Sequence, residues 1–284
     1  MNQGEETEKP KPGLGNPQDI RVLMYRRIVC DEDAGHADTS AVRVSQFQSH
    51  MELLERWGFT SITLEDYRLF LEGVLNLPRK PVVIGFDGDY LELYELAFPV
   101  LQDLGMKAVI FVGVSPNRKG SAWDALDGGD VSPLLNERQI IEMHSAGFEI
   151  GSRALTGGDL TAMPAEAAWE EISRSRMLLE ILLNAPVKTF AYPDGALNAE
   201  TKRMVADAGY TVAWSLHSGL ATLTLDPFEV RPIVLDSRVT GLGLALRLSS
   251  PYRLFQSAQW RWQEFFGSTN GRRVNDRRES EKSQ

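Results

Sequence analysis

The sequence predicts an α/β fold, a single distorted (β/α) barrel, and three observations support this prediction. Strand-like and helix-like segments alternate along most of the 284 residues. A glycine follows four of the predicted helices, where a helix end often needs a positive φ angle. Repeated strand–helix alternation favours a parallel sheet, and about eight such units are enough to close that sheet into a barrel.

Short runs of apolar and β-branched residues are typical of strands. We expect strands at 20–25, 61–64, 81–86, 107–113, 148–152, 189–193, 211–216 and 230–235. Longer stretches with helical periodicity alternate with these runs. We expect helices at 44–58, 90–105, 136–147, 164–183 and 198–209. The glycines that end four of these helices are Gly58, Gly105, Gly147 and Gly209.

The two ends of the chain differ in composition from the barrel, which we expect to span residues 20–240. Residues 1–19 are polar and rich in proline and glycine, which predicts a disordered N-terminal arm. Residues 241–267 mix apolar runs with arginines and tryptophans and predict a C-terminal helical extension. This extension packs on the barrel, lies on a membrane surface or contacts a protein partner. Residues 268–284 predict a disordered, mildly basic tail.

Composition excludes several classes of function. The chain has 30 Lys and Arg against 39 Asp and Glu, so its net charge of −9 disfavours nucleic-acid binding. Its single cysteine, Cys30, excludes an intrachain disulfide and a cysteine-based zinc site. The sequence shows no signal peptide and no apolar run long enough for a transmembrane helix. We therefore expect a cytoplasmic protein, with peripheral membrane attachment as the alternative.

Polar residues and glycines gather where the predicted strands end. The carboxyl ends of parallel strands meet at one end of a barrel, which is where barrel enzymes place their chemistry. The residues at these strand ends are Arg26, Asp87, Gly88, Asp89, Arg153, Gly157 and Asp194. Two aromatic residues, Tyr192 and Trp214, belong to neighbouring strands and either pack inside the barrel or form a platform for sugars.

Four motifs at these strand ends, in order and with matching spacers, resemble the polysaccharide deacetylases. This family carries the NodB homology domain and is carbohydrate esterase family four. The motifs lie at 25–28, 85–90, 149–160 and 190–195, and the resemblance extends from about residue 21 to 234. The resemblance implies a barrel of the NodB type and metal-assisted deacetylation of a carbohydrate. In that reaction a divalent metal, usually zinc, polarises the acetyl carbonyl and acidifies a bound water.

The resemblance also assigns roles to individual residues. It makes Asp87 the general base and gives the backbone N–H of Asp194 a place in the oxyanion hole. It places the three protein ligands of the metal at Gly88, Arg153 and Gly157. Glycine has no ligand atom in its side chain, and an arginine guanidinium does not deprotonate. The sequence therefore predicts that no metal cofactor is bound.

The strand-end charges suggest what replaced the metal. Asp87, Asp89 and Asp194 would be suitable oxygen ligands for Mg²⁺ or Ca²⁺, but Arg26 and Arg153 lie in the same region and would oppose a cation. A buried carboxylate without a partner is unfavourable. We therefore expect Arg153 to form an ion pair with Asp87 within about 4 Å.

The histidines lie outside these motifs. Because the family's metal site depends on histidines, their positions decide whether another site of that kind is available. His50 and His144 fall on predicted helices, whereas His36 and His217 fall in loops. We predict that all four are surface residues and not metal ligands.

Three functions follow from these observations. The first is a catalytically impaired deacetylase-like protein of carbohydrate metabolism, a pseudoenzyme that binds a glycan, such as an acidic sugar, or a partner in polysaccharide synthesis. The second is an active hydrolase that removes acetyl groups from N-acetylated sugars by a metal-free or otherwise non-standard route. The third is a membrane-associated scaffold of a glycan assembly system that acts through residues 241–267.

Overall fold

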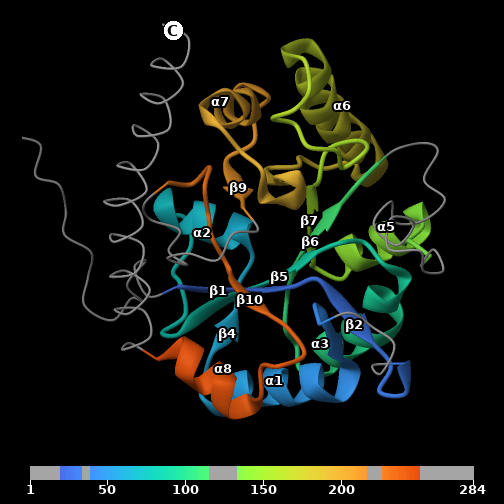
Figure 1. Cartoon of the computed structure of the whole chain (residues 1–284). Helices are drawn as coiled ribbons and strands as arrows, with labels where there is room; N and C mark the ends of the chain where they lie inside the picture. The colour runs from blue at the N-terminus through green and yellow to red at the C-terminus, as the bar shows by residue number, and fades with distance from the viewer. Residues whose placement is uncertain (1–19, 34–38, 115–132, 216–225, 250–284) are drawn as a thin grey trace, which may run out of the picture.

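A curled sheet of eight parallel strands lies at the centre of the computed structural model, which describes residues 20–33, 39–114, 133–215 and 226–249 (Figure 1). The strands are β1 (Arg21–Tyr25), β4 (Thr60–Ser61), β5 (Pro81–Asp87), β6 (Val109–Val112), β7 (Glu149–Ser152), β8 (Thr189–Ala191), β9 (Val212–Trp214) and β10 (Ile233–Leu235). Their order is β10-β1-β5-β6-β7-β8-β9, with β4 paired beside β5. The predicted α/β class is therefore confirmed.

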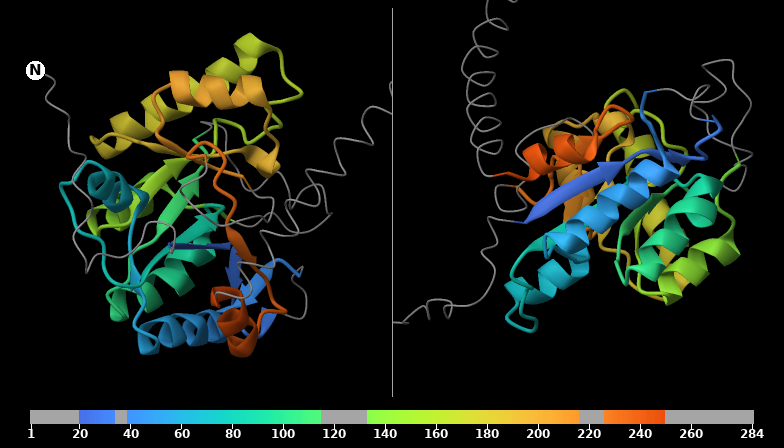
Figure 2. Two further views of the ribbon diagram at one scale, coloured as in Figure 1. Left: turned by 90° about the vertical axis from the view of Figure 1, so that its left-hand side faces the viewer. Right: turned by 90° about the horizontal axis from the view of Figure 1, so that it is seen from below.

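Helices surround this curled sheet, as the views in Figure 2 show. They are α1 (Val44–Arg56), α2 (Leu64–Leu71), α3 (Phe98–Asp103), α5 (Glu137–Ser145), α6 (Ala165–Leu183), α7 (Ala199–Asp207) and α8 (Gly241–Leu248). A π-helical turn, η3 (Leu93–Ala97), precedes α3, and a 3₁₀ turn, η4 (Pro193–Gly195), follows β8. A second, two-stranded parallel sheet consists of β2 (Arg27–Val29) and β3 (Ala41–Arg43).

One short segment joins the two edges of the curled sheet. Val230 forms a parallel bridge with Trp214, the last residue of β9. A few residues later, β10 pairs in parallel with β1, where Leu23 lies opposite Ile233. The curl thus brings β1 and β9 close enough for a single segment to contact both. This arrangement confirms the predicted distorted barrel, in the form of a half-barrel closed by residues 230–235.

Aromatic side chains fill the interior of the curl. Trp214 is 1% exposed, and the centroid of its ring lies 5.0 Å from that of Phe111. A Cβ atom at Gly85 of β5 would lie 2.3 Å from the Trp214 ring, so the tryptophan packs there only because Gly85 has no side chain. Gly151 of β7 accommodates Phe111 in the same way, since a Cβ atom there would lie 2.6 Å from its ring.

Two predicted elements differ from the structure. The strand predicted at 61–64 is wrong beyond Ser61, because Thr63 caps a helix that begins at Leu64. The hydroxyl of Thr63 accepts from the N–H of Asp66, whose carboxylate accepts from the N–H of Thr63. The helix predicted at 90–105 is present from residue 91 to 103 but contains the π-turn η3, and Pro99 just after this turn has no N–H to donate to the helical ladder.

The predicted chain ends fall largely outside the described residues. The arms at 1–19 and 268–284 lie outside them entirely, and of the extension at 241–267 the structure describes residues 241–249, with α8. This helix packs on α1, and the side-chain amide of Gln46 donates to the carbonyl of Val239 just before it. In the part of the chain described, no helix combines the length and hydrophobicity needed to span a membrane.

A buried histidine connects α1 to β1 and to the segment before α8. His50 is fully buried, so the prediction that it lies on the surface is wrong. Its Nε2 lies 2.8 Å from the carbonyl oxygen of Val239, and its Nδ1 lies 3.1 Å from the hydroxyl of Tyr25. Because a carbonyl can only accept, Nε2 carries the proton and Tyr25 donates to Nδ1. Burial lowers the pKa of His50 below 6.5 despite the hydrogen bond to Val239.

We expect His50 to make the fold sensitive to acid. Because its pKa is lower in the folded chain, the unfolded chain binds more protons, so the stability due to neutral His50 is present above about pH 6.5 and is lost as the pH falls further. Urea unfolding of the wild type and His50→Gln should show a smaller loss of stability between about pH 7 and about pH 5.5 in the variant. His144→Gln on α5 is the matched control. An identical loss in wild type and His50→Gln would contradict this assignment.

Candidate functional site

The candidate site lies at the carboxyl ends of β5 and β7, on either side of β6. Asp87 is the last residue of β5 and is 2% exposed. Arg153 follows β7 directly, and its backbone N–H donates to the carbonyl of Val112 at the end of β6. The Nε atom of Arg153 lies 3.1 Å from Oδ1 of Asp87. The ion pair expected from the sequence is therefore present.

This contact is ionic without the geometry of a hydrogen bond. Neither carboxylate oxygen of Asp87 accepts a hydrogen bond from the described residues, and Nε of Arg153 donates none to them. Buried polar atoms without hydrogen bonds are unfavourable, so the attraction between the two charges is what compensates their burial. A terminal nitrogen of Arg153 also lies 3.7 Å from Oδ1 of Asp194, so the guanidinium lies beside two carboxylates.

The charges of this cluster shift the pKa values of its members. Burial lowers the pKa of Arg153, but the carboxylates of Asp87, Asp89 and Asp194 outweigh burial and hold that pKa above its ordinary value. Burial raises the pKa of Asp194, and the charge of Asp87 adds to the rise, while Arg153 and Arg26 oppose it. The site is thus a set of coupled charges in which the arginines balance the carboxylates.

The backbone at the predicted ligand positions favours glycine. Gly88 has a φ angle of 145°, and a Cβ atom there would lie 2.9 Å from the ring of Tyr90 and 3.3 Å from the carbonyl oxygen of Arg26. Gly157 has a φ angle of 76°. Both values lie where residues with a side chain are strained. An aspartate at Gly88 would therefore require the turn to rearrange.

The residues present do not fit the divalent metal that the family resemblance implies. Within the described ranges, no three His, Cys, Asp or Glu side chains are grouped so that they could hold an ion. The alternative set of Asp87, Asp89 and Asp194 is also unsuitable. The carboxylate of Asp89 accepts from the N–H of Gly113, 3.0 Å away, and the guanidinium of Arg153 lies between the other two carboxylates.

The remaining residues predicted for the pocket have different surroundings. Tyr192 and Trp214 are both buried, which agrees with packing inside the barrel and leaves neither ring exposed to a sugar. The hydroxyl of Tyr192 donates to the carbonyl of Phe228, 3.0 Å away. Arg26 is half-buried between β1 and β2, close enough to Asp194 for its charge to lower the pKa of that carboxyl. His36 and His217 lie outside the described residues.

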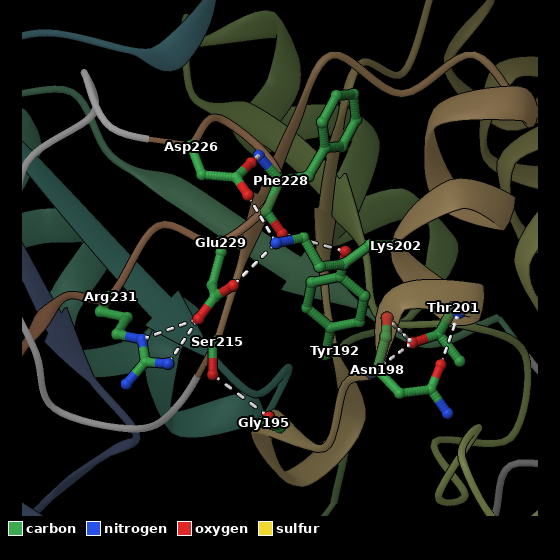
Figure 3. A network of polar contacts seen from close by, with 10 residues as sticks. All are labelled: Tyr192, Gly195, Asn198, Thr201, Lys202, Ser215, Asp226, Phe228, Glu229 and Arg231. Atoms are coloured by element: carbon green, nitrogen blue, oxygen red, sulfur yellow. Dashed lines mark hydrogen bonds and ion pairs between the residues drawn. The ribbon is translucent and has the colours of Figure 1, made fainter. Parts of the chain in front are cut away.

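A polar network supports the turn that carries Asp194 (Figure 3). Asp194 has a left-handed backbone, with φ 56° and ψ 10°, which is strained for a residue with a side chain. The hydroxyl of Ser215 donates to the carbonyl of Gly195 in the same turn. Such strain persists only where the surrounding contacts fix the backbone, and the bonds around η4 provide these contacts.

Sequence reasoning missed the charged part of this network. Figure 3 shows Lys202 of α7 lying between Asp226 and Glu229, and its Nζ is 2.7 Å from Oε2 of Glu229. Glu229 also pairs with Arg231. These ion pairs fix residues 226–231, which contact β9 and precede β10, onto α7. The only signal in the sequence is a run of charged residues before the last strand, and it does not reveal a partner on α7.

Comparisons with known proteins agree with this architecture. The polysaccharide deacetylase family matches residues 75–213. The YxkH protein of Bacillus subtilis is 27% identical over 235 residues, which cover 82% of this chain and 77% of that protein. A poly-β-1,6-N-acetyl-D-glucosamine N-deacetylase of Staphylococcus aureus is 23% identical over 205 residues, covering 69% of this chain and 68% of that enzyme.

A solved structure shows the same fold. The deacetylase PplD of Streptococcus pyogenes, in complex with acetate, superposes with a TM-score of 0.70 and 22% identity. The match covers 81% of this chain and 98% of that one. The family match includes β5, β7 and β8, whose carboxyl ends carry the candidate site. The chain is therefore similar to the polysaccharide deacetylases over residues 75–213 and shares the fold of PplD.

Proposed function

We propose that this chain is a deacetylase-like protein that binds a glycan but does not remove its acetyl groups by the metal-assisted route of the polysaccharide deacetylase family. One observation carries the proposal. The guanidinium of Arg153 lies 3.1 Å from the carboxylate of Asp87, although the resemblance gives position 153 to a metal ligand and Asp87 to the general base. The ion pair thus takes the place in which the family would hold a metal.

The chemistry of the two cations explains why this exchange matters. A bound divalent metal polarises the acetyl carbonyl and converts its bound water into a nucleophile near neutral pH. A guanidinium supplies positive charge and hydrogen-bond donors, but it has no open coordination position for a water. Asp87 beside Arg153 therefore lacks the activated water on which a general base of this family would act. Arg153, Arg26 and Asp194 can still bind a ligand through their charges and hydrogen bonds.

The ligand that we propose is a carbohydrate with acidic or hydroxyl groups. Asp194 is about one-third exposed, and Arg153 is 14% exposed, so a ligand at the strand ends would reach the edge of the ion cluster. Arginine binds carboxylates and vicinal hydroxyls through its planar set of donors. The Staphylococcus aureus relative is named for poly-β-1,6-N-acetyl-D-glucosamine, which makes oligomers of that polymer the first ligands to test.

One feature favours the second candidate, an active hydrolase with a non-standard mechanism. Both carboxylate oxygens of Asp87 are buried and lack hydrogen bonds from the described residues, so either is available as a base if substrate binding brings a water to it. Arg153 would then stabilise the developing negative charge of the substrate. This candidate and the first share their residues and differ in whether a product is released.

We expect the ion pair to contribute to stability as a buried pair does. Arg153→Met leaves Asp87 buried without its partner, and removing one member of such a pair destabilises by about 3 to 5 kcal/mol. Because Asp87→Asn removes the opposing charge, the double variant should recover part of this loss in a double-mutant cycle measured by urea unfolding. Arg174→Met is the control, since Arg174 and Glu170 form an exposed pair on α6 worth at most about 1 kcal/mol. A zero coupling energy would contradict the assignment.

We expect no deacetylation of β-1,6-linked N-acetylglucosamine oligomers by the full chain, with or without added zinc. The reason is that the strand ends, as far as the structure describes them, provide no ligand set for a metal that activates water. Release of acetate measured over hours tests this expectation, with a metal-dependent deacetylase as positive control. If acetate is released and the release disappears in Asp87→Ala, the second candidate is correct and the first is wrong.

A further inference from the structure

A cavity of about 370 Å³ opens at the opposite end of the sheet from the strand-end site. Its walls come from the start of α2, the ends of α5 and α6, and the segments that lead into β6, β7 and β8. The floor is apolar and contains Phe148, Ile150, Leu183 and Pro186. This volume is sufficient for a small organic molecule, and an apolar floor with a few polar groups is typical of ligand sites.

The arginine and lysines around this cavity differ in how closely a carboxylate pairs with each of them. Arg68 is paired with two carboxylates of its own helix, Glu65 and Glu72, so this group has more negative than positive charge. Lys107 has a looser partner, because its Nζ lies 3.6 Å from a carboxylate oxygen of Asp66. Lys188 makes no ion pair with any described residue. Of the three lysines and arginines in the described wall, Lys188 is therefore the one without a carboxylate at ion-pair distance, although its charge lowers the pKa of Glu65.

The carboxylate of Glu149 lies in the cavity wall, and its charge affects the affinity of the cavity for an anion. Oε2 of Glu149 accepts from the backbone N–H groups of Leu64 and Glu65 at the start of α2, at 2.7 and 3.2 Å. Burial raises the pKa of Glu149 to about 7, against the lowering effect of these hydrogen bonds. The other titratable or charged groups lining the cavity are Glu65 and Arg68 on α2, Lys107 before β6, His144 on α5 and Lys188 before β8.

We propose that this cavity binds a small organic carboxylate whose apolar body rests on Phe148 and Leu183 and whose charge is held by Lys107 and Lys188. A monoanion is favoured over a dianion, because Glu149 and Glu65 in the same wall repel additional negative charge. Protonation of Glu149 removes one of these repulsions, so binding of the carboxylate is coupled to uptake of a proton. This site lies outside the deacetylase-like site and does not depend on its function.

Calorimetric titration of the full chain with hexanoate, 1-hexanol and hexylammonium tests the proposal. We expect hexanoate to bind with a dissociation constant in the millimolar range or below, at least tenfold more tightly than the other two. Lys188→Met should weaken hexanoate binding roughly tenfold, since a hydrogen bond to a charged group is lost. Lys80→Met is the matched control, because Lys80 precedes β5 at the same end of the sheet but does not line the cavity.

The role of Glu149 is tested by pH. Hexanoate affinity should rise severalfold from about pH 8 to about pH 6 in the wild type, and Glu149→Gln should bind equally well at both. The glutamine retains an oxygen for the N–H groups of α2, so this variant should fold. Absence of saturable hexanoate binding, equal binding of 1-hexanol, or an unchanged affinity in Lys188→Met would each overturn the proposal.

Discussion

The ion pair between Asp87 and Arg153 is the interaction on which the rest of the candidate site depends. Asp87 ends β5 and is buried, so its charge must be balanced from within the protein. Arg153 provides this balance across β6 and also approaches Asp194. The glycine backbone at Gly88 belongs to the same arrangement, because a side chain there would collide with the ring of Tyr90.

The curl of the sheet sets the distances that this ion pair requires. Trp214 and Phe111 occupy the interior, and the missing side chains of Gly85 and Gly151 allow the rings to approach the strands. Residues 230–235 then connect β9 to β1, and the ion pairs of Lys202 hold the residues just before this segment on α7. The same curl brings the starts of β6, β7 and β8 around the second cavity. Packing in the middle of the sheet thus positions polar groups at both of its ends.

Much of the fold could be predicted from the sequence, because alternation of apolar segments and the glycine helix ends are local signals. All four of those ends are confirmed by positive φ angles, at Gly58, Gly105, Gly147 and Gly209. Local signals also explain the differences, since the capping box at Thr63 and the π-turn before Pro99 were hidden inside longer apolar patterns. His50 was placed on the surface because a histidine on a helix does not reveal that a distant carbonyl, that of Val239, satisfies its ring.

The sequence predicted contacts in the site only between residues that belong to the four motifs. The pairing of Asp87 with Arg153 followed from their positions in two motifs, whereas the ion pairs of Lys202 and the second cavity combine segments with no common pattern. The central claim is that Arg153 takes the place of a metal. Elemental analysis of the full chain, purified without chelators and dialysed against zinc, tests it most directly. The account predicts far less than one metal ion per chain. One zinc ion per chain, retained through gel filtration, would contradict it.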